Sequence, residues 1–458
     1  MEKKKLIEIA NLRQYFPVKK ESLLQKEQLY VKANDGITIT IHEGETYGLV
    51  GESGCGKSTL GRVLLQLYDQ TRGDTVYFGR TVYEYQPKYY EKDLNDLAKL
   101  HEKAKHLESK INNEDPNHTS VDAYDDAMRH LYRLCGGLVF SDNYSEVSKL
   151  LLEEYKAGCN VAQLEKKNAS AEELKAAEAK HDAILKSIEQ MKDSYRSNEN
   201  FAKIDAMWEH GIELPRLTKE EMRILREDLQ IIFQDPYSSL NPRMTVEDII
   251  GEPLDVHKLY ANKKERREKI LNLMELVGLN AEHAMRYAHE FSGGQRQRIG
   301  IARALAAEPE FIVCDEPVSA LDVSIQAQIL NMLVELQKEL GLSLLFISHD
   351  IGVVRFISDR IGVMYLGTLM EETETEELFE HPLHPYTEAL FEAVPDPYIK
   401  RTELKGLSGE QPVRTEDFKG CAFYTRCPYA TDCCKAERPE LIEVKPGHKV
   451  ACHRYNND

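Results

Sequence analysis

The sequence feature that most constrains this chain is the glycine-rich stretch GESGCGKST at residues 51–59, which has the form GxxxxGKS/T. Its glycines let the backbone bend so that successive N–H groups converge on phosphate oxygens. Lys57 places a compact positive charge on the outer phosphates, and the Ser58 hydroxyl can ligate Mg²⁺. An apolar run at residues 45–50 precedes the stretch and a helical pattern follows it, so the helix N-terminus faces the same anion. The pattern predicts a nucleotide-binding loop between a strand and a helix.

Length and charge narrow the class of protein. A chain of 458 residues is too long for one ordinary core, so we expect several domains. A net charge of −18 argues against broad binding of nucleic acid or of an anionic membrane surface. No apolar run approaches the length that spans a bilayer, and residues 1–8 lack the apolar core of a secretory signal. We expect a cytosolic protein whose membrane association goes through partners.

Three further apolar runs end in polar side chains that suit phosphoryl chemistry. Residues 231–233 lead into Gln234, residues 311–314 into Asp315 and Glu316, and residues 343–347 into Ser348 and His349. Apolar strands that alternate with helices indicate a largely parallel sheet, whose carboxyl ends gather ligands at one edge. We expect Asp315 to reach the Mg²⁺ shell and Glu316 to orient an attacking water. Gln234 can contact both the metal and that water, and His349 can bind the terminal phosphate.

The segment from about residue 86 to residue 215 has a different character. It is charged and helix-patterned, with one apolar stripe over residues 97–111 and another over residues 174–191. Ser170 and Glu173 form a plausible capping box before the second stripe. We predict that the two stripes form an antiparallel helical hairpin within an inserted subdomain, whose function the sequence does not reveal.

The motifs together resemble the nucleotide-binding subunit of an ABC transporter, in the order that family has them. Residues 51–59 match Walker A, Gln234 the Q-loop, residues 292–295 the signature, Asp315-Glu316 Walker B, residues 319–322 the D-loop and His349 the switch histidine. The resemblance implies a P-loop NTPase of the ABC ATPase type, an α/β fold that hydrolyses ATP with Mg²⁺. Phe291 replaces the more usual leucine of the signature, which is a mild change.

The resemblance also implies a paired site. In the family, two ATPase subunits associate head to tail, and the signature of one closes over ATP held by the Walker A loop of the other. We therefore expect a homodimer, or a heterodimer with a second ABC ATPase. Catalysis is assigned to Glu316, His349 and Gln234, and the Mg²⁺ ligands to Ser58, Gln234 and Asp315. The predicted ATP contacts are Phe16, Gly51, Glu52, Ser53, Gly54, Cys55, Gly56, Lys57, Ser58, Thr59, Ser292, Gly293, Gly294, Gln295 and Asp322. For Phe16, stacking on adenine and simple core packing both stay open.

Other stretches are similar to the ATPases of oligopeptide and dipeptide importers. They are residues 233–242 (FQDPYSSLNP), residues 384–387 (HPYT) and the cysteine-rich tail. This resemblance implies two transmembrane permease subunits, an extracytoplasmic peptide-binding protein and a place at the cytoplasmic face of the membrane. The loop after Gln234 is expected to receive a helix from a permease. A nickel importer of the same subfamily is the alternative, since substrate choice lies in other subunits.

The tail holds five of the nine cysteines. In a reducing compartment such a cluster suggests metal ligation more than disulfides. Cys421, Cys427, Cys434 and Cys452 match the spacing with which some family members hold a four-iron four-sulfur (4Fe–4S) cluster. Zinc ligation and plain packing of buried thiols stay open.

The predicted domains are residues 1–85 and 217–392 for the nucleotide-binding domain, 86–216 for the inserted helices and 393–458 for the C-terminal domain. Inserted helices are also typical of ABC ATPases that repair DNA. In those proteins, however, long coiled coils follow the equivalent glutamine, whereas this insert precedes Gln234 in an acidic chain. A plain regulatory ATPase is a further alternative.

Overall fold

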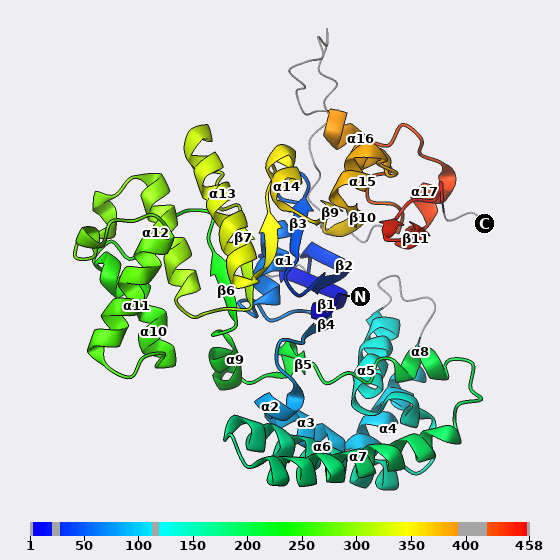
Figure 1. The fold of residues 1–458 in the computed structure, drawn as a ribbon. Coiled ribbons are helices and arrows are strands. Elements are labelled where there is room, and N and C mark those ends of the chain that lie inside the picture. The colour runs from blue at the N-terminus through cyan, green and yellow to red at the C-terminus, as the bar shows by residue number, and fades with distance from the viewer. Residues whose placement is uncertain (1–2, 21–27, 112–118, 393–418, 456–458) are drawn as a thin grey trace. The chain divides into compact units, whose positions relative to one another are not determined.

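A computed structural model describes residues 3–20, 28–111, 119–392 and 419–455. The chain divides into two compact units (Figure 1). Unit 1 holds residues 1–6, 10–71 and 222–458, and unit 2 holds residues 7–9 and 72–221. The predicted domain 393–458 begins outside the described residues, which resume at residue 419.

The centre of unit 1 is a sheet in the order β11-β12-β10-β9-β3-β8-β7-β6. Strand pairs β9–β3, β3–β8, β8–β7 and β7–β6 are parallel, while β10 and β12 add an antiparallel side. The strands are β3 (Thr46–Val50), β6 (Leu229–Ile232), β7 (Phe311–Asp315), β8 (Ser343–Ile347), β9 (Arg360–Tyr365), β10 (Thr368–Glu374), β11 (Ile442–Lys445) and β12 (His448–Val450). Two long strands, β1 (Lys5–Pro17) and β2 (Tyr30–His42), belong to a second sheet, and residues 7–9 of β1 count with unit 2.

Buried strands form the core of unit 1. Every residue of β3, β7 and β8 is buried, which is the composition that a parallel sheet covered on both faces requires. The helices are α1 (Lys57–Leu64), α10 (Val246–His257), α11 (Lys263–Leu276), α12 (Gly293–Leu305), α13 (Val323–Leu340), α14 (Ile351–Ile357), α15 (Thr375–Glu380), α16 (Pro385–Glu392) and α17 (Asp432–Ala436). Short 3-10 turns lie at η3 (Ala281–His283) and η4 (Ala288–Glu290). One apolar cluster runs from α10 through β7 and β8 to Phe423 in the C-terminal segment.

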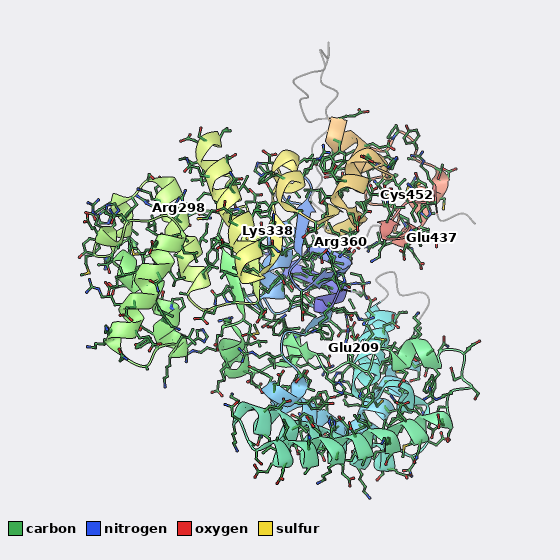
Figure 2. The ribbon with its side chains drawn as sticks, viewed as in Figure 1. Glu209, Arg298, Lys338, Arg360, Glu437 and Cys452 are labelled. Carbon is green, nitrogen blue, oxygen red and sulfur yellow. The ribbon has the colours of Figure 1, made fainter. Side chains whose placement is uncertain are left out.

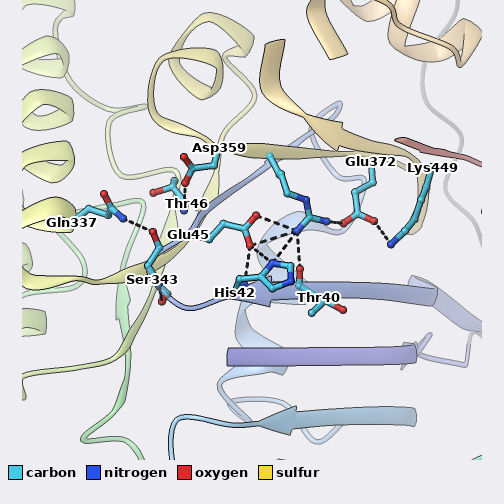
Figure 3. A network of polar contacts seen from close by, with 11 residues as sticks. Thr40, His42, Glu45, Thr46, Gln337, Ser343, Asp359, Glu372 and Lys449 are labelled. Carbon is cyan, nitrogen blue, oxygen red and sulfur yellow. Dashed lines mark hydrogen bonds and ion pairs between the residues drawn. The ribbon is translucent and has the colours of Figure 1, made fainter. Parts of the chain in front are cut away.

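A buried ionic network joins the strands at the amino end of β3. Arg360 on β9 lies between two fully buried carboxylates, Glu45 and Glu372, with Nη1 3.1 Å from Glu45 Oε1. His42 Nδ1 lies 2.8 Å from Glu45 Oε2, and Lys449 Nζ lies 3.3 Å from Glu372 Oε2 (Figure 3). The network ties the C-terminal strand β12 to the strand that leads into the phosphate loop.

Unit 2 is mainly helical. It contains β4 (Arg72–Tyr77), α2 (Val82–Tyr85), α3 (Lys88–Asn95), α4 (Leu97–Glu108), α5 (Thr119–Cys135), η1 (Gly136–Phe140), α6 (Tyr144–Lys166), α7 (Ala171–Asp193), α8 (Phe201–Asp205), β5 (Ile212–Glu213) and η2 (Leu214–Arg216). Helix α9 (Lys219–Leu225) begins in unit 2 and ends in unit 1. Strands β4 and β5 pair antiparallel.

The capping box of Ser170 and Glu173 opens α7 as predicted. The predicted hairpin is wrong, because α7 packs along α6 whereas α4 packs along α5. Helix α6, in which Val147, Leu151 and Tyr155 are buried, takes the place beside α7 that was assigned to α4. A buried histidine, His130, joins β5 to α3, with its ring nitrogens 2.7 Å from Glu213 Oε1 and 3.1 Å from Asp93 Oδ2. Burial acts to raise the pKa of Glu213, but His130 and neighbouring arginines lower it to about 2.

Candidate functional site

A cavity of about 1000 Å³ opens in unit 1 at the carboxyl ends of β3, β6, β7 and β8. The parallel pairing explains this convergence, because it brings the residues that follow each strand to one edge of the sheet. The predicted site residues that line the cavity are Phe16, Ser53, Gly54, Gly56, Lys57, Ser58, Thr59, Gln234, Glu316 and His349.

The glycine-rich loop wraps around its own lysine. Lys57 is 4% exposed, and its Nζ donates to Gly51 O at 2.7 Å and to Glu52 O at 3.0 Å. Gly51 and Gly56 have φ of +148° and +101°, and a Cβ on them would lie 2.1 Å from Met364 O and 2.0 Å from Ala33 O. Only glycine fits between these carbonyl groups, so the loop is held in one curved path with an ammonium group at its centre.

Glu316 contacts residues that follow two other strands, β6 and β8. Its Oε2 accepts a hydrogen bond from Gln234 Nε2 at 3.1 Å and lies 3.1 Å from His349 Nδ1. Its backbone has φ of +49°, and its N–H donates to Ile347 O at 3.0 Å. The carboxylate is 11% exposed, while the histidine is half exposed. This constrained backbone fixes a carboxylate inside the cavity, where it can accept a proton or orient a water molecule.

Asp315 lies directly before it and is buried. Arg62 Nη2 lies 3.4 Å from Asp315 Oδ2, whereas Oδ1 has no hydrogen-bond partner among the residues the structure describes. A buried carboxylate oxygen without a partner is costly unless a ligand completes it, and Mg²⁺ prefers such an oxygen. Burial raises the pKa of the neighbouring Cys314 thiol to about 12, with a smaller contribution from Asp315.

Several predicted ATP contacts lie elsewhere. Ser292, Gly293, Gly294, Gln295 and Asp322 do not line the cavity. They open two helices, because Ser292 and Gln295 form the capping box of α12 and Asp322 is the N-cap of α13. These helix starts pack together, and a Cβ on Gly294 would lie 2.4 Å from Ile325 Cγ2. The exposed start of α12 can therefore meet an anion only from outside this cavity.

Phe16 lines the cavity together with residues 31–33 of β2. These three residues of β2 were not among the predicted ATP contacts. The Phe16 ring contacts Tyr68 edge-on, with the centroids 5.4 Å apart. The preceding residue, Tyr15, donates its hydroxyl to Asp35 Oδ1 at 2.6 Å. Cys55 is buried, and burial raises the pKa of its thiol. Residues 31–33 had no signal beyond an ordinary strand pattern.

The tail cysteines lie in the C-terminal segment, where Figure 2 labels Cys452 and Glu437. Cys421 N–H donates to Cys434 O at 2.7 Å, and all nine cysteines are free thiols. Burial raises the pKa of Cys421 to about 12 and also raises that of Cys427 and Cys452. Within the described ranges no group of three or more His, Cys, Asp or Glu side chains is arranged to hold a metal ion. This arrangement does not fit a preformed cluster site, and the iron–sulfur assignment stays a prediction.

Comparison with known proteins gives two family matches and several long relatives. The ABC transporter model matches residues 34–204 and 203–319, and the model of the oligopeptide/dipeptide transporter C-terminal region matches residues 370–434. The oligopeptide transport ATP-binding protein AppF of Bacillus subtilis is 37% identical over 455 residues, covering 98% of both chains. OppF of the same bacterium is 36% identical over 450 residues, covering 98% of this chain and 96% of OppF. A third relative from Bacillus subtilis, the putative oligopeptide transport ATP-binding protein YkfD, is 38% identical over 455 residues, covering 99% of this chain and 96% of YkfD.

Proposed function

Because the chain belongs to the ABC transporter family and contains the ATP-hydrolysing domain of that family, we propose that it energises an importer of oligopeptides or dipeptides. The observation that carries the proposal is similarity along the whole chain to proteins named for oligopeptide transport. The match to the oligopeptide/dipeptide transporter C-terminal region adds support from a part of the chain outside the ATP site.

The residues around the cavity suggest a division of labour in hydrolysis. Lys57 and the loop N–H groups bind the ATP phosphates, and Phe16 packs beside the base. Ser58, Gln234 and the unpartnered oxygen of Asp315 would hold Mg²⁺, which neutralises phosphate charge when bound. Glu316 accepts the proton of the attacking water, while Gln234 and His349 hold that carboxylate in place.

We infer that a second ATPase subunit completes the site. The signature residues 292–295 open the 13-residue helix α12, whose N-terminus suits a phosphate, but they lie outside the cavity of their own chain. A head-to-tail partner, identical or similar, would bring this helix start to the nucleotide. The start of α13 at Asp322 packs against it and would belong to the same interface.

Membrane partners are proposed for the surface beyond Gln234. Among the described residues no helix is long and apolar enough to cross a bilayer. Tyr237, Met285 and Tyr287 are exposed large apolar side chains, and the Arg296 guanidinium lies 4.1 Å from the Tyr237 ring centroid. These side chains suit a helix from a permease subunit, which would place the protein at the cytoplasmic face of the membrane. A binding protein outside the cell would deliver the peptide.

The predicted division into residues 1–85, 86–216, 217–392 and 393–458 stays a proposal. Its test is a chain in which residues 86–215 are replaced by a short linker. We expect this chain to keep its ATP affinity, because the residues lining the cavity all lie in unit 1. Complete loss of nucleotide binding in a folded deletion protein would show that the insert is integral to the ATPase core.

For the tail, iron and zinc analysis of anaerobically purified protein separates the open alternatives. Brown protein containing iron would support a 4Fe–4S cluster on Cys421, Cys427, Cys434 and Cys452. Zinc without iron would support four-thiolate zinc. Folded protein free of both metals would leave the packing of buried thiols.

The transport function is tested by reconstitution with any permease subunits that copurify with this chain. We expect ATP hydrolysis in proteoliposomes to rise when peptide-loaded binding protein is added, and labelled peptide to enter with it. Stimulation by nickel alone would favour the nickel importer. Salt-dependent retention on DNA together with failure to copurify with permeases would contradict the transport proposal.

A further inference from the structure

The C-terminal segment, residues 419–455, reaches back to the phosphate loop. Arg426 Nη1 donates to Glu52 Oε2 at 3.0 Å and to the Tyr365 hydroxyl at 3.2 Å. The arginine side chain is 8% exposed and that of Glu52 is 23% exposed. Glu52 is the second residue of the loop, and its own N–H donates to the Tyr386 hydroxyl at 3.0 Å. Both the side chain and the backbone of Glu52 are thus held by residues beyond the ATPase motifs.

A second arginine of the same segment contacts the wall at the other end of the loop. Arg438 Nη1 lies 3.2 Å from Asp35 Oδ2, and Asp35 is buried. The neighbouring Asn34 donates from Nδ2 to Gly56 O at 3.1 Å. Asp35 N–H donates to Gly367 O at 2.8 Å, and Gly367 N–H donates to Cys55 O at 2.9 Å. The two arginines therefore act on opposite ends of the same loop.

Aromatic packing fixes the first arginine in place. Phe423, which is buried, packs against Tyr365 and Tyr386 with centroid distances of 5.4 Å and 5.3 Å. The Arg426 guanidinium also lies 5.7 Å from the Tyr365 ring centroid. Strand β12 anchors the end of the segment by pairing with β10. A guanidinium held this way has little freedom left to lose, unlike the arginine of an exposed surface ion pair.

The charges give the contact a role in ATP binding. Glu52 places a carboxylate on a loop that receives a polyanion, and that negative charge opposes the phosphates unless a cation neutralises it. Because Arg426 is mostly buried, its pairing with Glu52 is screened less than a surface pair. Loss of Arg426 would leave this carboxylate without its guanidinium on the loop that binds the phosphates.

We propose that Arg426 is a positioning residue for ATP binding, which neutralises Glu52 and holds the start of the phosphate loop. Arg438 supports the far end of the loop through Asp35. The inference rests on the ATP site of the proposed function. It assigns the C-terminal segment a share in nucleotide affinity, separate from any metal on its cysteines.

The test compares Arg426→Ala and Arg426→Gln with the wild type in the full chain, with ATP affinity measured by equilibrium binding and steady-state hydrolysis measured in parallel. We expect KM and Kd for ATP to rise about tenfold while kcat stays within about twofold, since Arg426 does not touch the reacting groups. Arg426→Lys keeps the charge and should recover part of the affinity. Arg454→Ala is the matched control, because this arginine of the same segment contacts Glu388 at 4.0 Å and the rings of Tyr429 and Tyr455 rather than the phosphate loop.

A double-variant cycle tests the electrostatic reason directly. In the Glu52→Gln background the opposing charge is gone, so Arg426→Ala should change KM less than about threefold. Equal KM in wild type, folded Arg426→Ala and folded Arg426→Gln would overturn the inference. An effect of Arg426→Ala on KM that is undiminished in the Glu52→Gln background would also overturn it. If Arg426→Ala does not fold, Arg426→Gln and Arg426→Lys decide the question. Wild-type protein without ATPase activity would instead contradict the proposed function.

Discussion

Replacing Glu316 by glutamine separates nucleotide binding from hydrolysis. The amide has nearly the shape of the carboxylate, so the backbone at φ of +49° and the surrounding packing are retained. In the wild type, Gln234 Nε2 and His349 Nδ1 each lie 3.1 Å from Glu316 Oε2. The amide oxygen can still accept one of these hydrogen bonds, but the negative charge and the capacity to take a proton are lost.

The size of the effect follows from that lost proton acceptor. A positioned general base contributes about 10²–10⁴-fold to a rate, which corresponds to about 2.7–5.4 kcal/mol of activation free energy. ATP affinity should change by no more than about twofold, because the phosphates are bound by the glycine loop and Lys57. We therefore expect Glu316→Gln to bind ATP normally and to hydrolyse it at least about a hundredfold more slowly.

The assay measures ATP binding at equilibrium and hydrolysis in a single turnover, for wild type, Glu316→Gln and Glu335→Gln. Glu335 is exposed on α13 and lies outside the cavity, so its variant controls for the loss of one negative charge. Hydrolysis by Glu316→Gln within about fivefold of the wild type would refute the general-base role. Loss of ATP binding in a folded variant would show that this carboxylate instead shapes the phosphate site.

Three further predictions concern ionisable side chains of unit 1. Lys57→Ala should weaken ATP binding about 10- to 100-fold in an equilibrium titration, because a buried ammonium group and its hydrogen bonds to the loop disappear. Arg360→Met should lower the free energy of unfolding by about 3–5 kcal/mol in urea, because the buried carboxylates of Glu45 and Glu372 lose their shared cation. Burial lowers the pKa of His384 to about 4, whereas a histidine in the unfolded chain has a pKa of about 6.5. Between these two pH values His384 is therefore protonated in the unfolded chain and neutral in the folded protein. The free energy of unfolding should therefore fall by up to about 3 kcal/mol as the pH drops through that window. His384→Asn should remove this loss. If the free energy of unfolding of the variant falls with pH as steeply as that of the wild type, His384 is not the source of the loss.

The ATPase site could be placed from the sequence because its parts stand at strand ends. Short buried runs such as Phe311–Asp315 and Ser343–Ile347 are typical of central parallel strands. Once the strands are parallel, the residues after them must share an edge. The structure accordingly brings Gln234, Glu316 and His349 to one cavity with the phosphate loop.

The helical insert shows where this reasoning stops. Periodicity identified the apolar faces of α4 and α7, but it does not say which other face covers each of them. Helix α6 had a long buried face of its own and became the partner of α7. His181, a polar residue within the apolar stripe of α7, lies 2.7 Å from the buried Glu154 of α6, so it marks the α6–α7 contact. A polar residue within an apolar stripe can thus specify a partner that the period alone leaves open.

The arginine contacts of the tail were out of reach for a different reason. The chain has 59 Lys and Arg and 77 Asp and Glu, which admit several thousand oppositely charged pairs. Arg426 and Glu52 are 374 residues apart, and neither a period nor a capping pattern connects them. Their pairing depends on Phe423 being packed between Tyr365 and Tyr386, which only the folded core brings together. If the tail were merely an appendage of the ATPase, its arginine would have no reason to be buried against the phosphate loop; the tenfold change in KM expected of Arg426→Ala is therefore the measurement that separates an appendage from a working part of the site.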